Sequence, residues 1–144
     1  MKGMTVIVKS ITRAVVGYIL LYGIYIVTHG HLTPGGGFAG GVVIAGCFIL
    51  VFLAYGAGIA KIRMEKMWVS LEECLGVFLF WSLAVVGVVK GSAFFENVLA
   101  KGEPLKLFSG GSIPISNIGI GIEVAAAIFM IFITLAVLGK GENS

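Results

Sequence analysis

The stretch FAGGVVIAGCFILVFLAYGAGI, residues 38–59, contains no charged side chain. A membrane-spanning helix needs about 20 apolar residues at about 1.5 Å per residue, and this run has that length. Three further apolar runs cover residues 12–28, 68–89 and 115–138. Only 12% of the chain is charged, whereas a soluble domain carries about 25% charge. We therefore predict an all-α integral membrane protein with one domain, residues 1–144, of four transmembrane helices.

The basic residues predict how these four helices are oriented. Four crossings place seven of the ten basic residues on the side of the termini and three on the other side. Lysine and arginine concentrate on the cytoplasmic side of membrane proteins. We expect a multi-pass protein of the cell (cytoplasmic) membrane with both termini in the cytoplasm. The first group is Lys2, Lys9, Arg13, Lys61, Arg63, Lys66 and Lys140, and the second is Lys90, Lys101 and Lys106.

The short connection between the first two helices is rich in glycine and spells G-x-G-x-x-G from Gly35 to Gly40. A dinucleotide site would need a preceding strand and an acid about 20 residues on. Here a membrane helix precedes the glycines, and the next acid is Glu65, beyond another span. The two histidines of the chain are too few to hold a metal ion alone. We expect no cofactor, no metal and no nucleic acid.

The same glycines suit a tight turn followed by close helix packing. Pro34 and Gly35 turn the chain, and two glycine pairs four residues apart let a helix backbone approach its neighbour. These pairs are Gly36 with Gly40 and Gly37 with Gly41. His31 lies in the turn, where it either handles protons at the water interface or only forms a hydrogen-bonded turn.

Glu123 is the ionisable residue that the sequence places deepest in the membrane. It lies about eight residues into the last run, roughly 12 Å down, in a hydrocarbon core about 30 Å thick. An ionisable group there costs several kcal/mol unless it is paired, hydrated or neutral. Glu123 is therefore either a residue of a proton or cation pathway or a hydrogen-bonded structural glutamate.

Glu72 and Glu73 open the third apolar run. A helix N-terminus favours carboxylates, so these residues either complement the helix dipole or form the cytoplasmic mouth of an ion path. The longer connection after this run, residues 90–112, carries Phe94, Phe95, Val98 and Leu99 at helical spacing. This spacing predicts a short amphipathic helix at the membrane interface. No serine or cysteine has a nearby histidine and acid, so we expect no enzyme.

The stretch GHLTPGGGF at residues 30–38 resembles the G-H-x-x-P-G-G-G-F signature of the MnhB/MrpB family, the B subunit of Mrp-type multisubunit sodium/proton antiporters. The same subunit type occurs in archaeal membrane-bound hydrogenases and sulfur-reducing complexes. The matching residues are Gly30, His31, Pro34, Gly35, Gly36, Gly37 and Phe38. That family often has an acidic residue at the start of its last helix, where this chain has Asn117.

The resemblance implies a non-catalytic membrane subunit whose partners are the other subunits of an antiporter or hydrogenase-like complex, the lipid bilayer, sodium ions and protons. In one interpretation the chain lines an ion pathway through Glu123, with Glu72 and Glu73 at the cytoplasmic entrance and His31 at the opposite turn. In the other it is purely structural and serves assembly.

Overall fold

Among the residues that the structure describes, four helices are long and apolar enough to cross a membrane. The computed structural model describes residues 3–56, 66–91, 93–97, 99, 102–103, 105–106 and 109–141. The helices are α1 (Val6–His29), α2 (Gly37–Tyr55), α4 (Lys66–Val89) and α5 (Ile113–Gly141). No strand occurs over these ranges. The predicted all-α membrane protein with four transmembrane helices is therefore confirmed.

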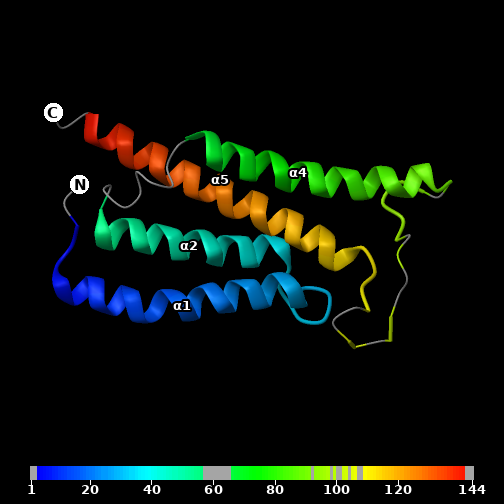
Figure 1. The fold of residues 1–144 in the computed structure, drawn as a ribbon, viewed down its shortest axis with the longest axis horizontal. Helices are drawn as coiled ribbons and strands as arrows, with labels where there is room; N and C mark the ends of the chain where they lie inside the picture. Colours follow the sequence, from blue (N-terminus) through cyan, green and yellow to red (C-terminus); the bar gives the residue numbers. More distant parts are fainter. Residues whose placement is uncertain are drawn as a thin grey trace.

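The helices lie side by side in the order α1, α2, α5, α4 (Figure 1). α2 packs between α1 and α5, while α4 packs closely on α5 alone and α1 touches α5 only slightly. Successive helices run in opposite directions, so α1 begins and α5 ends at the same end of the molecule. The glycine-rich turn and the loop between α4 and α5 lie together at the opposite end.

Hydrogen bonds join the start of α1 to the end of α2, and no hydropathy pattern indicates them. α1 begins at Val6, six residues before the predicted start. The Met4 amide donates to the Ala54 carbonyl at 2.9 Å, and the Tyr55 hydroxyl donates to the Lys9 carbonyl at 3.3 Å. α2 ends at Tyr55 instead of residue 59, because Gly56 adopts φ +79° and its amide donates to Phe52. Residues 57–65 lie outside the described ranges.

Small side chains fill much of the core between the helices. Ala45, Ala54 and Ala84 are almost completely buried, and Cys47 is the largest side chain among the fully buried described residues. The Cys47 thiol donates to the Val16 carbonyl at 3.5 Å. Two phenylalanine pairs link α2 to α5, Phe48 with Phe129 and Phe52 with Phe132. Small residues let membrane helices approach closely, so most large side chains are left pointing outward.

Candidate functional site

The glycine motif begins with a turn that follows α1 directly. The His29 carbonyl accepts from the amides of Leu32 and Thr33, at 2.8 and 3.0 Å. Gly35 and Gly36 then adopt φ +146° and +110°, a region that side-chain-bearing residues rarely occupy. The Gly36 carbonyl accepts from the Gly40 amide at 3.0 Å. Two strained positions thus need glycine before α2 starts.

The first turn of α2 is wedged between two other helices. A Cβ atom added at Gly40 would lie 2.9 Å from the Gly23 carbonyl oxygen on α1. A Cβ atom at Gly41 would lie 2.8 Å from the Gly121 carbonyl oxygen on α5. Gly37 also lies against α5, at the backbone of Asn117. Neighbouring glycines of the motif therefore face different helices, whereas the sequence pattern indicates only that some helix comes close.

Asn117, on the second turn of α5, is a site residue whose place the sequence does not reveal. Its side chain lies against the glycine motif, since a Cβ atom at Gly30 would come within 2.6 Å of the Asn117 Nδ2 atom. A Cβ atom at Gly36 would lie 3.7 Å from the Asn117 Oδ1 atom. The polar side chain thus lies directly beside the backbone of the motif.

His31 lies half-buried beneath the loop that joins α4 to α5. Its Nε2 atom donates to the Lys106 carbonyl at 3.4 Å. Its ring packs on Gly110, where a Cβ atom would lie 3.1 Å from the ring carbons Cγ and Cδ2. The Nδ1 atom is buried, and no described residue forms a hydrogen bond with it. The loop therefore covers the histidine that the sequence placed at the water interface.

The loop itself is organised by polar side chains. Asn97 donates from Nδ2 to the Gly110 carbonyl at 2.9 Å and accepts at Oδ1 from the amide and hydroxyl of Ser112, at 2.9 and 3.1 Å. Phe94 and Phe95 lie in a turn, and Phe95 has φ +63°. The predicted interfacial helix is wrong over these residues. The Ala93 amide donates to the Glu96 carboxylate at 2.9 Å, and such a local side-chain bond to the backbone competes with helix formation. Val98 lies outside the described residues.

Replacing Asn97 with alanine is expected to loosen this loop. The change removes three hydrogen bonds, and a net loss of about 1.4 kcal/mol would open the loop roughly tenfold more often. Hydrogen exchange at the Ser112 amide, measured by mass spectrometry, should quicken by roughly that factor. Glu103→Ala is the matched control on the same loop, because its ion pair with Lys106 is exposed and such pairs contribute little. Equal exchange in both variants would refute the bracing role of Asn97.

Glu123 lies near the middle of its helix. It follows Ile113, the first residue of α5, by ten residues, or about 15 Å, which is half the thickness of a bilayer core. Glu123 is half-buried at the crossing of α4 and α5. A Cβ atom at Gly76 would lie 2.8 Å from the Glu123 Cβ atom and 2.7 Å from the Gly119 carbonyl oxygen. In the described part of the chain, no side chain forms an ion pair or hydrogen bond with the Glu123 carboxylate.

Glu72 and Glu73 lie deeper in α4 than the sequence indicates. α4 begins at Lys66 and has no acid in its first turn, and the influence of the helix dipole fades beyond that turn. The dipole interpretation of these two residues is therefore wrong. Glu73 is half-buried and lies one turn before Gly76, on the same face of the helix. Glu72 is exposed.

The structure thus brings some predicted site residues together and separates others. Glu123 lies beside Gly76 of α4, and Glu73 precedes Gly76 by three residues on the same face of α4. His31 lies at the start of α5 beside Gly110, so it is remote from both carboxylates. Among the residues with described positions, no group of three histidine, cysteine or acidic residues could hold a metal ion.

These spans define a class of protein: a helical membrane protein that crosses the bilayer several times. A family described as "Domain related to MnhB subunit of Na+/H+ antiporter" matches residues 7–131. The chain therefore belongs to the MnhB family of antiporter subunits.

Relatives of the chain occur in bacteria and archaea. A putative antiporter subunit mnhB2 of Staphylococcus saprophyticus is 36% identical over 94 residues, which cover 65% of this chain and 66% of that protein. An uncharacterized protein of Methanocaldococcus jannaschii is 31% identical over 130 residues, 86% of this chain. The match spans 49% of that archaeal protein, so the chain corresponds to about half of it.

A solved structure has a similar fold. A chain in the membrane-bound sulfane sulfur reductase, an archaeal respiratory membrane complex, superposes with a TM-score of 0.76 and 32% sequence identity. The match covers 92% of this chain and 57% of that one. Members of this family thus occur both as antiporter subunits and within an archaeal membrane complex.

Proposed function

We propose that this chain is a non-catalytic membrane subunit of a sodium/proton-translocating module and that Glu123 contributes an ionisable group to its ion pathway. The module belongs either to a stand-alone antiporter or to an archaeal respiratory complex of the hydrogenase type. The chain lies in the cytoplasmic membrane with both termini inside, and it works with the other subunits of the module. The half-buried, unpartnered carboxylate of Glu123 at mid-membrane depth is the observation that carries this proposal.

A carboxylate at that depth must be protonated, hydrated or close to a cation. Those are the states through which a residue of an ion pathway passes. Gly76 packs against the backbone of α5 at Gly119 and Glu123, so the Glu123 side chain leaves α5 beside a close contact of the two helices. Glu73 lies one turn away on the same interface and supplies a second carboxylate. In this proposal the exposed Glu72 lies at the cytoplasmic mouth, and His31 lies at the opposite end of the route.

The proposal is tested by Glu123→Gln in the intact complex. Glutamine preserves the shape of the side chain but cannot carry a proton or a negative charge. Sodium/proton exchange in membrane vesicles should fall about a hundredfold, the scale of losing a positioned proton-transfer group. Co-purification of the other subunits should stay unchanged. Glu123→Asp should retain part of the activity.

The control is Glu103→Gln, which makes the same chemical change on the exposed loop and should leave exchange unaltered. Exchange at the normal rate in an assembled Glu123→Gln complex would exclude the direct role. That result would favour the second candidate function, a purely structural subunit that holds its neighbours together. The glycine-mediated crossings of α1, α2 and α5 are the observation that supports this alternative.

A further inference from the structure

α1 carries a regular row of outward-facing residues that we name the outer seam: Ile7, Ile11, Ala14, Tyr18, Leu21 and Tyr25. These residues alternate in steps of four and three, and each of them is exposed. Tyr18 is 76% exposed, the largest exposed fraction among the tyrosines of this row. The seam residues form one row on a broad exposed face of α1, because Ser10, Arg13 and Tyr22 are exposed beside them. The inward face of α1, with Thr12, Gly23 and Val27 buried, already packs on α2.

The tyrosines of α1 lie where a lipid-facing helix does not favour them. Tyr18 follows Val6 by twelve residues in a helix of 24, so it lies about 18 Å from the start of the helix and close to its middle. Tyrosine prefers the two membrane interfaces, where its hydroxyl meets water. Tyr25, near the end of α1, stacks on the ring of His29 with centroids 4.1 Å apart, whereas Tyr18 lies well inside the span.

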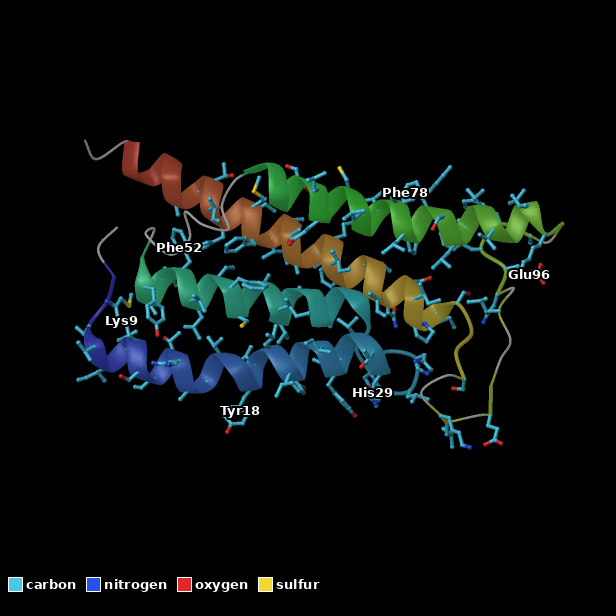
Figure 2. The ribbon with its side chains drawn as sticks, in the orientation of Figure 1. Lys9, Tyr18, His29, Phe52, Phe78 and Glu96 are labelled. Atoms are coloured by element: carbon cyan, nitrogen blue, oxygen red, sulfur yellow. The ribbon has the colours of Figure 1, made fainter. Side chains whose placement is uncertain are left out.

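These hydroxyls lack partners within the chain. Tyr18 points away from the other helices (Figure 2), and Tyr22 is 60% exposed. Over the residues that the structure describes, neither hydroxyl forms a hydrogen bond. Acyl chains of lipid offer no acceptor, and an unpaired hydroxyl in hydrocarbon is unfavourable. The outward side of α4 is also mixed: Leu75 and Phe78 are apolar, whereas Trp81, which carries an indole N–H, is 56% exposed.

We propose that the outer seam of α1 packs against a membrane-spanning helix of a different subunit. That helix presents carboxylate, amide or carbonyl acceptors to Tyr18 of the seam and to Tyr22, which is exposed beside the seam one turn further along. A second copy of this chain would instead join Tyr18 to the same chain, and crosslinking from Tyr18 distinguishes that outcome. The inference rests on the proposed function only in requiring that the chain has partner subunits.

Gly17 supports a close approach of that helix. It lies beside the seam, and a Cβ atom added there would have no atom within 4 Å. Small residues on a membrane helix allow another backbone to come near. A large residue at this position would therefore obstruct a partner without disturbing the packing within the chain.

The identity of the partner is tested by photo-crosslinking in the intact complex in native membranes. A benzophenone-bearing amino acid replaces Tyr18, and the adducts are mapped by peptide mass spectrometry. The expected adduct joins the chain to a membrane-spanning segment of a different subunit. The same replacement at Phe78, which is 62% exposed on α4, should yield lipid adducts. It serves as the reference for crosslinking to lipid. Adducts at Tyr18 confined to lipid, or to a second copy of the chain, would overturn the proposal.

Two sets of variants test the contacts themselves. Tyr18→Phe and Tyr22→Phe keep the rings but should weaken association with the partner roughly threefold per lost hydrogen bond. Gly17→Leu should abolish crosslinking from Tyr18. Gly46→Leu is the matched control, because Gly46 also has no atom within 4 Å of an added Cβ and lies near the middle of α2. Unchanged association in all the α1 variants would contradict the proposal. None of these readouts requires ion transport, so they can fail independently of the Glu123 test.

Discussion

Replacing Gly40 with leucine is expected to prevent the chain from reaching its folded state in the membrane. A Cβ atom at this position would lie 2.9 Å from both the Gly23 carbonyl oxygen and the Val27 amide nitrogen. Both are backbone atoms of α1, so no rotation of a side chain can make room. Overpacking of a core costs about 1–3 kcal/mol even where side chains can adjust. A clash with backbone exceeds that cost, against a total stability of about 5–15 kcal/mol.

The loss is measured as the amount of monodisperse chain recovered from membranes in mild detergent, together with its thermal midpoint. Gly46→Leu serves as the control because it introduces the same side chain into the same helix at an open position. It should be recovered at the wild-type level. Similar recovery of both variants would mean that α1 and α2 do not pack through Gly40.

Replacing Gly76 with leucine is expected to detach α4 from the rest of the protein. A Cβ atom here would lie 2.7 Å from the Gly119 carbonyl oxygen and 2.8 Å from the Glu123 amide nitrogen. Among the helices that the structure describes, α4 packs closely on α5 alone, so α5 is the one that holds it in place. The contacts between α1, α2 and α5 should survive. Separation would also expose Glu123, so ion exchange should be lost together with the packing of α4.

Hydrogen exchange distinguishes this local effect from general unfolding. In the Gly76→Leu variant, amides of α4 should exchange faster while those of α2 keep their protection. Val77→Leu is the control, because Val77 is 47% exposed on the adjacent position of α4 and should change neither exchange nor transport. Equal loss of protection in α2 and α4 would show that the α4–α5 crossing does not act as a separable contact.

The sequence predicts the number of spans well, because each span is a continuous apolar run whose physical requirement is local. It does not predict which helices are neighbours. Gly41 packs on Gly121, eighty residues away, and nothing in a glycine shows which surface it will contact. The order α1, α2, α5, α4 follows from such distant pairs, so it emerges only in the folded chain.

The candidate site, like the fold, can be predicted from the sequence only in part. The depth of Glu123 follows from counting residues along a helix, and the structure places it about 15 Å from the start of α5. Its contact with α4 is made at Gly76, a residue with no chemical signal of its own. Glu73 and Glu72 look equivalent in sequence, yet one is half-buried and the other exposed, since adjacent residues of a helix point in different directions. The contact between Asn117 and the glycine motif likewise joins residues far apart in the chain.

The linear row of helices has a consequence for biosynthesis. α1 and α2 form a hairpin of neighbouring segments, so they can associate as soon as both have left the ribosome. α4 is made before α5, the one helix against which it packs closely. During that interval α5 is not yet present, so Glu73 and the surface of α4 around Gly76 have no partner from this chain. A chaperone or a waiting neighbour that shields α4 at this stage would therefore influence how much of the protein matures, independently of how stable the finished row is.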